Sequence, residues 1–415
     1  MSDRIVITGL GLWTCFGRGT EPLLSAMRRG DRGFRPVRGM LFDDHPFFPT
    51  KMAMQIEPEP PSMWDNARRA VDWPSTLAVE TALDAYEAAE IPAGMYDKRR
   101  VGVLNGTSHG ANHGLLEFVR QRVVEGRVPD ASLVARSASW VGRSIAARIN
   151  ARGVNLTINT ACSSGLNAFG LAARLLRSHR IDCALAGGND TFSLLSFAGF
   201  SSLRAIDPNG CQPFDVQRQG MSLGDGAAYC VLERESEARS RGARILAAIT
   251  GYRSAGDGHH ATAPDPEGKG AMEVMSSALA EDGHAEDLAL VSAHGTGTPA
   301  NDSAELRAIS SVVEAFAIPG PIHVSSIKSQ VGHTLGAAGA IQVIAAILCM
   351  HDRLVPGTIG LRTPLSHTPP LNLPKEPQAG DIPLALCNSL GFGGSVASLC
   401  LRRINEPFVV SHSST

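Results

Sequence analysis

The sequence has 415 residues, which is too many for one simple hydrophobic core and predicts two domains or one large duplicated fold. With 43% hydrophobic and 19% charged residues it is globular, and its net charge of −2 gives no reason to expect nucleic acid or a membrane surface as a partner. The eight cysteines form no C-x-x-C pair, so neither a zinc site nor a disulfide framework is indicated. We therefore expect no bound metal, reduced thiols and a cytoplasmic protein.

The first half of the chain alternates predicted strands with predicted helices. In chain order these are a strand over 4–11, an amphipathic helix over 75–91, strands over 100–108 and 154–158, a helix over 165–177 and a strand over 181–190. The first strand is broken by glycines, which argues against a signal peptide.

A second series of elements begins near residue 245. It comprises strands over 244–256, 288–298 and 322–329, an Ala-rich helix over 336–350, and two strands joined by a glycine turn within 384–403. The Ala-rich helix is too short to span a bilayer comfortably and is expected to be buried on all sides. Both series place a small-residue loop between a strand and a helix. We therefore expect an α/β fold around largely parallel sheets, duplicated as halves 1–245 and 246–415.

The stretch NTACSSGLNAFG places Cys162 at a strand-to-helix junction. Free backbone N–H groups and the positive end of the helix dipole would meet its sulfur there, which lowers a thiol pKa and favours the nucleophilic thiolate. The alternative is a buried cysteine that packs as a small hydrophobe. Judged on this one cysteine, the packing interpretation is preferred. The other loops therefore decide between packing and catalysis.

Three other glycine-rich turns carry polar residues directly after predicted strands. The residues are His294, Thr296, Thr298, Asp302 and Glu305 in SAHGTGTPANDSAE, Lys328 and His333 in SSIKSQVGHTLG, and Asn388 and Phe392 in NSLGFGG. Each has an ordinary explanation as a turn histidine, a solvated lysine, a helix cap or turn chemistry. Strand ends that point into one crevice are nevertheless where α/β folds build sites, so together the four loops predict a nucleophilic cysteine with polar partners.

Taken together, these stretches resemble the β-ketoacyl-acyl carrier protein synthases of the elongating, FabF-like type, which are thiolase-like condensing enzymes. The matching pieces are VITGLGLWTCFG, NTACSSGLNAFG, PFDVQRQGMSLGDGAA, HGTGTPANDSAE, SSIKSQVGHTLGAAGA and NSLGFGGS. The resemblance implies a duplicated five-layer αβαβα fold and a Cys-His-His active site. It also implies a homodimer, or a heterodimer with a related ketosynthase-like subunit. No cofactor is implied, because the substrates are carried on the phosphopantetheine of an acyl carrier protein.

The resemblance also implies a role for individual residues. Cys162 matches the acyl-accepting nucleophile, and His294 and His333 match the histidine pair that promotes malonyl decarboxylation. Their expected partners are Lys328 with Glu305 as electrostatic support, Asp302 and Asn388 as further supporting residues, Phe392 as the gate and oxyanion donor beside Cys162, and Thr296 and Thr298 on the phosphopantetheine arm.

Two further groups of residues were compared with the family pattern. The first departs from that pattern, and the second matches positions on the protein surface. In NGTSHGANHG, His109 stands where the family has an aliphatic residue of the acyl pocket, and Met221 stands where it has Phe. Either this loop brings its polar side chains to a polar group, or its path is shifted locally from that of the family. Its polarity argues against a long saturated acyl chain as the substrate. Arg204, Arg68 and Arg69 match positions that dock the acidic carrier protein, with solvated surface charge as the alternative.

These observations predict a β-ketoacyl-(acyl carrier protein) synthase. Such an acyltransferase extends a Cys162-bound acyl chain by two carbons through decarboxylative condensation with a malonyl carrier protein in fatty acid biosynthesis. The first alternative is a polyketide or aryl-polyene ketosynthase with a dedicated carrier and partner subunit. A more remote alternative is a non-catalytic subunit that only shapes the cavity of its partner.

Overall fold

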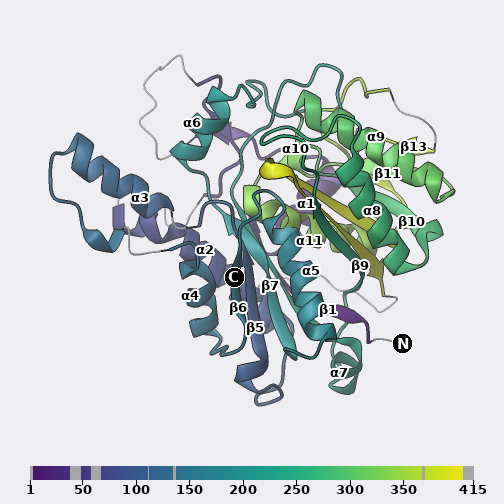
Figure 1. Ribbon diagram of the computed structural model, residues 1–415, viewed down its shortest axis with the longest axis horizontal. Coiled ribbons are helices and arrows are strands. Elements are labelled where there is room, and N and C mark those ends of the chain that lie inside the picture. The colour runs from purple at the N-terminus through teal and green to yellow at the C-terminus, as the bar shows by residue number, and fades with distance from the viewer. Residues whose placement is uncertain are drawn as a thin grey trace.

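A mixed β-sheet of twelve strands runs through the molecule, which is shown as a computed structural model in Figure 1. The structure describes residues 3–37, 48–57, 67–110, 112–133, 137–366 and 370–404. The strands of this sheet are β1 (Ile5–Thr14), β2 (Gly17–Arg18), β5 (Val101–Gly106), β6 (Asn155–Ile158), β7 (Cys183–Asp190), β8 (Gly226–Arg234), β9 (Ala247–Gly256), β10 (Leu288–Ser292), β11 (Ile322–Ser325), β13 (Leu371–Asn372), β15 (Leu384–Gly391) and β16 (Ser395–Arg403). Two small ribbons pair β3 (Arg35–Pro36) with β4 (Met52–Ala53) and β12 (Leu354–Val355) with β14 (Gln378–Ala379).

The sheet consists of two halves with the same strand order. The first half runs β6-β5-β7-β8-β1 and the second runs β11-β10-β15-β16-β9. In both, the chain order of neighbouring strands is third, second, fourth, fifth, first, with two parallel pairings followed by two antiparallel ones. The halves join where β1 pairs antiparallel with β9. The duplication is therefore visible in the topology, while the division at residue 245 stays a prediction.

The expectation of largely parallel sheets holds only for the outer strands of each half. β15 and β16 are joined by the short turn Phe392–Gly394, and a tight turn can connect only antiparallel neighbours. β16 runs antiparallel to both of its neighbours, and so does β8 in the first half. The sheet is therefore mixed.

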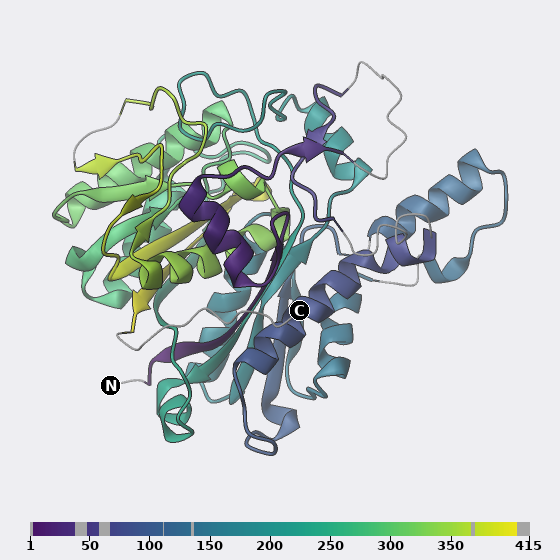
Figure 2. The same ribbon diagram turned by 180° about the vertical axis from the view of Figure 1, so that it is seen from behind.

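The helices form three layers around the two halves of the sheet. They are α1 (Thr20–Arg29), α2 (Ala67–Ala88), α3 (Asn112–Val119), α4 (Trp140–Arg148), α5 (Ser164–Arg177), α6 (Leu194–Ser202), α7 (Glu235–Ser240), α8 (Lys269–Asp282), α9 (Pro299–Ala315), α10 (Lys328–Val331) and α11 (Ala338–Asp352). α5 and α11 pack against each other and contact strands of both halves. α2 and α4 cover the outer side of the first half, and α8 and α9 cover that of the second (Figures 1 and 2). The result is the αβαβα arrangement expected from the resemblance.

The central helix α11 is buried on all sides, as its composition predicts. Every residue from Ala338 to Met350 is buried, and α11 shares the largest apolar cluster with α5. Among the described residues, one 18-residue segment, Leu335–Asp352, is long and apolar enough to cross a membrane, but 89% of it is buried inside the protein. This segment contains the core helix α11, which begins five residues after His333.

Candidate active site

Cys162 lies in the short connection between β6 and α5. Ala161, the residue before it, adopts a left-handed backbone with φ of 51°, which turns the chain sharply between strand and helix. Cys162 is 7% exposed, and α5 begins two residues later at Ser164. The strand-to-helix junction inferred from the sequence is therefore present.

Two histidines from the second half of the chain meet this cysteine. The sulfur of Cys162 and one ring nitrogen of each of His294 and His333 all lie within 4.8 Å of one another. His333 Nε2 is 3.1 Å from Cys162 Sγ, and the two imidazole rings cross edge to face with their centroids 5.4 Å apart. β6 and β11 are the third strands of their halves, so the Cys162 loop and the loop that carries Lys328 and His333 are equivalent in the duplication. The predicted convergence of these loops is thus observed.

The partners of the two imidazoles fix which nitrogen of each ring carries the proton. The N–H of Leu335 donates to Nδ1 of His333 at 3.2 Å, and Lys328 Nζ lies 3.4 Å from Nδ1 of His294. Both Nδ1 atoms therefore accept, so the hydrogen of each neutral ring lies on Nε2. Burial, with the charge of Lys328, holds the pKa of both imidazoles well below the usual range. The site therefore presents two neutral N–H donors.

Lys328 is held by the backbone of the histidine loop. Its Nζ donates to the carbonyl oxygen of His294 at 2.6 Å, and burial lowers the pKa of the ammonium group to about 8. Glu305 in α9 accepts the N–H groups of His294 and Gly295 at 2.7 and 2.8 Å, and burial raises the pKa of this carboxyl to about 7. The lysine and the glutamate therefore fix the position of the His294 loop from two sides.

Asp302 and Asn388 support this network one step further from the sulfur. Asp302 accepts the N–H groups of Phe214 and Gly297 at 2.7 and 3.1 Å. Asn388 Nδ2 lies 3.4 Å from Glu305 Oε1 and Asn388 Oδ1 accepts from Ser398 at 2.8 Å. Both residues tie the loops to α9 and to β16, and neither borders the cavity.

The pKa of the Cys162 thiol differs from the sequence-based prediction. Burial raises it to about 11, although the Lys328 charge and the backbone N–H groups of Phe392 and Cys162 lower it in part. The prediction of a lowered pKa was wrong because the loss of water around the sulfur outweighs the helix terminus. The two N–H groups that reach the sulfur are nevertheless those expected of an oxyanion hole.

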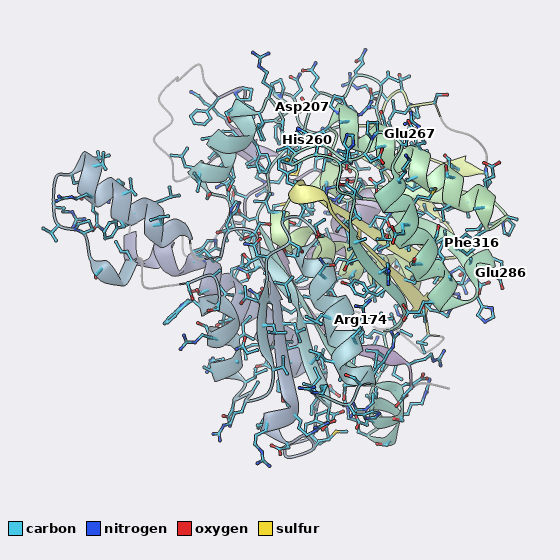
Figure 3. The ribbon with its side chains drawn as sticks, in the orientation of Figure 1. Arg174, Asp207, His260, Glu267, Glu286 and Phe316 are labelled. Carbon is cyan, nitrogen blue, oxygen red and sulfur yellow. The ribbon has the colours of Figure 1, made fainter. Side chains whose placement is uncertain are left out.

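A cavity of about 310 Å³ leads from the surface to Cys162. Of the predicted residues it is lined by Cys162, Met221, His294, Thr296, Thr298, His333, Phe392 and Arg204. Phe392 is 37% exposed, and its ring lies against Phe200 of α6, with centroids 5.7 Å apart. The N–H of Gly393 donates to Ala261, so the turn after Phe392 packs on the loop that carries His260 (Figure 3). The turn that carries Phe392 and the loop that carries His260 thus both border the cavity.

One predicted residue is not brought to the cavity wall, and two others have side chains outside the described residues. His109 is hydrogen-bonded to Ser196 and does not line the cavity. Arg68 and Arg69 lie in the first turn of α2, and their side chains fall outside the described residues. The arginine pair therefore stays a prediction, while Arg204 is exposed at the cavity.

Sequence reasoning missed Asp190, which ends β7. Its carboxylate accepts from Thr107 Oγ1 and from the N–H groups of Ser108, His109 and Gly336, at distances of 2.7, 2.7, 3.1 and 2.7 Å. One buried carboxylate thus joins the loop after β5 to the loop after His333. The signal was present, since Asp190 is also a polar residue at the end of an apolar strand.

Among the described residues, Cys162, His294 and His333 are the one group whose donor atoms lie close enough to hold a metal ion. Their hydrogen bonds do not suit one. A metal needs the lone pair of Nε2, whereas the Nδ1 partners place hydrogens there, and the Lys328 ammonium lies beside His294. The arrangement fits an anion that forms between two N–H donors.

Comparison with known proteins agrees with this site. The N-terminal domain of the β-ketoacyl synthases matches residues 2–238, and their C-terminal domain matches residues 246–362. The "3-oxoacyl-[acyl-carrier-protein] synthase 2" of Rhizobium meliloti (strain 1021) is 34% identical over 96% of this chain and 99% of its own length. The protein of the same name from Coxiella burnetii is 32% identical over 97% of this chain and 99% of its own.

Solved structures give the same result. "The ishigamide ketosynthase/chain length factor" superposes with a TM-score of 0.88 at 31% identity, covering 98% of this chain and 100% of that one. The chain therefore belongs to the β-ketoacyl synthase family. It is an acyltransferase of the 3-oxoacyl-(acyl carrier protein) synthase type, and the predicted family and thiolase-like fold are confirmed.

Proposed function

We propose that this chain transfers an acyl group from a carrier thioester to Cys162 and condenses it with a malonyl thioester. The observation that carries this proposal is the position of His333 Nε2, 3.1 Å from the Cys162 sulfur, beside a second neutral imidazole. In the first half-reaction the sulfur attacks the thioester carbonyl, the new S–C bond forms and the carrier thiol leaves with the cysteine proton. The N–H groups of Cys162 and Phe392 stabilise the tetrahedral oxyanion.

The two histidines act in the second half-reaction. Malonyl thioester loses carbon dioxide, and the electron pair of the broken C–C bond becomes an enolate. The Nε2–H groups of His294 and His333 stabilise the enolate oxygen without protonating its carbon, because the pKa of both rings lies well below neutral. The enolate carbon attacks the acyl-Cys162 carbonyl, and the chain leaves the sulfur two carbons longer with a β-keto group. No redox or metal cofactor is needed for this sequence of steps.

The rim of the cavity supports docking of an acidic carrier protein. Arg204 is exposed at the mouth and has no side-chain partner among the described residues. Next to it Leu203, which also lines the cavity, is 54% exposed, and Phe392 at the same rim is 37% exposed. Thr296 and Thr298 line the passage inward, and their hydroxyls lie 2.8 Å apart, where they can contact a phosphopantetheine arm. A positive charge among apolar side chains suits an acidic, partly apolar protein surface.

The edge of the first half of the sheet supports a dimer. β6 pairs with β5 on one side and has no partner strand on the other among the described residues, and its Leu156 is 39% exposed. α3 and the π turn Arg120–Val124 that follows it extend from the same half as an arm (Figure 1), with Val123 and Val124 exposed. A free strand edge beside exposed apolar side chains favours pairing with a second copy or a related subunit.

The pathway is the finer part of the proposal. Fatty acid elongation is favoured by the names of the sequence relatives, and a polyketide-type pathway by a solved structure titled "type II PKS acyl-carrier protein in complex with its ketosynthase bound to the hexaketide", with a TM-score of 0.88 at 26% identity. A non-catalytic role is disfavoured because the cysteine, both histidines and Lys328 are in contact. Location in the cytoplasm stays a prediction, since one relative from Arabidopsis thaliana is named mitochondrial.

The experiment that tests the proposal is intact-mass spectrometry of the protein after incubation with a panel of acyl-carrier thioesters, followed by a malonyl carrier thioester. We expect a mass increase on Cys162 equal to the acyl group, then release of a product two carbons longer. Acylation by saturated chains supports fatty acid elongation, and acylation only by oxygenated or unsaturated chains supports the polyketide alternative. A protein that takes up no acyl group from any thioester would contradict the proposal.

A further inference from the structure

A buried carboxylate binds the turn that follows His333. Asp190 ends β7 and is 2% exposed. Its Oδ2 accepts the N–H of Gly336 at 2.7 Å, and Leu335, the residue before this glycine, donates its own N–H to Nδ1 of His333 at 3.2 Å. Asp190 is therefore one residue removed from the hydrogen bond that places the hydrogen of His333 on Nε2.

The backbone between these two N–H groups has a conformation that side chains disfavour. Leu335 has φ of 51°, in the left-handed region, which persists in a residue with a Cβ only where neighbouring groups hold it. Gly336 packs so closely that a Cβ on it would lie 2.6 Å from the backbone nitrogen of Ser108 and 2.7 Å from Oδ2 of Asp190. The contact with Asp190 thus holds Leu335 in the conformation in which its N–H reaches the imidazole.

Both oxygens of Asp190 are occupied by donors, three of which are backbone N–H groups. Oδ1 accepts from Thr107 Oγ1 and from the N–H of His109. Oδ2 accepts the N–H groups of Ser108 and Gly336. Backbone N–H groups cannot accept, so only a carboxylate satisfies every donor here. An amide whose oxygen takes the place of Oδ2 would still satisfy the two N–H groups there.

The main chain of His333 is held separately from this contact. Its N–H donates to the carbonyl of Ser222 at 2.7 Å, and its own carbonyl accepts from Gly224 at 3.1 Å. If the N–H of Leu335 moved away, the imidazole would therefore stay beside Cys162, but its hydrogen could occupy either nitrogen. With the hydrogen on Nδ1, the Nε2 atom would accept from the thiol and offer no N–H to an enolate.

We propose that Asp190 is a positioning residue that fixes the tautomer of His333 through the turn 335–336, and that this control serves decarboxylation of the malonyl thioester rather than acyl transfer. The inference rests on the proposed function, since it assigns the two half-reactions to different supports. Acylation uses the N–H groups of Cys162 and Phe392, which reach the sulfur itself. Decarboxylation uses the Nε2–H of His333, which exists in one tautomer only.

The test measures the two half-reactions separately in Asp190→Ala, with mass spectrometry for acylation of Cys162 and single-turnover release of carbon dioxide for decarboxylation. We expect acylation no slower than in the unmodified protein. Decarboxylation should slow by about 10- to 100-fold, the usual loss when a partner that orients an imidazole is removed. Asp190→Asn should keep both rates, because its amide oxygen can still accept from Gly336.

Nuclear magnetic resonance of the full chain with nitrogen-15-labelled histidine reports the tautomer directly, and the signals of His333 are those absent from His333→Gln. We expect hydrogen on Nε2 in the unmodified protein and in Asp190→Asn, and a mixture of both tautomers in Asp190→Ala. Gly336→Ala separates the same contact from the other side and should reproduce the effect of Asp190→Ala. Thermal unfolding identifies the folded variants, so either substitution is sufficient if the other does not fold.

Thr107→Val is the matched control. Thr107 Oγ1 donates to Asp190 Oδ1 and accepts from Gly110, so its loss loosens the loop after β5 and leaves the contact with Gly336 intact. Both rates should stay normal in this variant.

Three results would overturn the inference. Equal loss of both half-reactions in folded Asp190→Ala, or an unchanged tautomer there, would show that Asp190 only ties the loops together. Decarboxylation as slow in Asp190→Asn as in Asp190→Ala would make the charge responsible instead of the hydrogen bond. Absence of acylation in the unmodified protein would overturn the proposed function instead, while the tautomer measurement, which needs no substrate, would still test the link between Asp190 and His333.

Discussion

His333 reaches the sulfur of Cys162 with the nitrogen that carries its hydrogen. Nε2 lies 3.1 Å from Sγ, while the opposite nitrogen accepts the N–H of Leu335, two residues further along the chain. A neutral imidazole in this tautomer donates to the sulfur and is a poor base toward the thiol. The same atom is therefore suited to stabilise a thiolate in one half-reaction and an enolate in the next.

Replacing Cys162 by Ala should abolish acyl transfer while leaving decarboxylation of a malonyl thioester measurable. The nucleophile is lost, but both Nε2–H donors remain in place. Intact-mass spectrometry measures acylation, and carbon dioxide release measures decarboxylation. Cys400→Ala is the control, because Cys400 is a fully buried thiol of the second apolar cluster and does not line the cavity. It should still be acylated, and an acylated Cys162→Ala protein would show that another residue accepts the chain.

Replacing His333 by Ala should reduce condensation by roughly 100- to 1,000-fold, the usual effect of removing one preorganised donor from an oxyanion. The acyl-Cys162 intermediate should still form, because its oxyanion is bound by backbone N–H groups. His333→Gln retains an N–H donor and should recover part of the lost rate. Single-turnover measurements separate the two half-reactions. A His333→Ala protein that condenses at the normal rate would contradict the role proposed for this residue.

Condensation should slow as the pH rises through about 8. Burial lowers the pKa of Lys328 to about 8, so the ammonium group beside His294 loses its charge in this range rather than near its usual value. The lost positive charge weakens stabilisation of the enolate, so the rate is highest below this pKa and falls above it. A pH–rate profile of the malonyl half-reaction measures the effect. The Lys328→Met variant should condense slowly at every pH and show no decrease in rate near pH 8. If the rate of the unmodified enzyme does not decrease there, the charge of Lys328 has no role in condensation.

Arg204→Glu should raise KM for carrier-bound substrates by roughly tenfold and leave KM for pantetheine thioesters unchanged. The side chain is exposed at the mouth of the cavity, where it meets a carrier protein before the arm enters. The effect should diminish with added salt, because exposed charges are screened. Arg180→Glu is the control, since Arg180 is an exposed arginine that does not line the cavity. If KM rises equally for carrier-bound substrates and pantetheine thioesters, Arg204 acts on the bound thioester rather than in docking of the carrier protein.

Leu156→Asp should weaken self-association by roughly 100-fold or more, because a carboxylate would be buried at the edge of β6 in each subunit. Analytical ultracentrifugation of the purified chain measures the dissociation constant. Leu194→Asp provides the comparison, since Leu194 is similarly exposed but lies on α6. If both variants associate as the parent chain does, β6 is not the dimer edge. A parent chain that is monomeric alone would favour pairing with a related, different subunit.

Local patterns were sufficient for most secondary structure. The alternation of apolar runs and glycine turns predicts β1, α5, β7, α11 and the β15–β16 pair at or close to their observed positions, whereas the strand predicted over 288–298 already ends at Ser292. The polar residues after strands predict the four loops that form the site. These features could be read from the sequence because strand and helix periodicity, and the need for glycine in tight turns, are properties of neighbouring residues.

The tertiary structure alone decided how these pieces act on one another. Sequence reasoning predicted a lowered pKa for the Cys162 thiol from its helix terminus, whereas burial beneath both halves raises it. The tautomers of His294 and His333 depend on Lys328 and Leu335, and His109 meets Ser196, 87 positions away. Desolvation and hydrogen-bond partners are set by which distant segments fold together, and no local pattern contains that information. The sequence by itself thus determined the family, the strands and the reacting residues, and the packing of the two halves determined their protonation and the shape of the cavity.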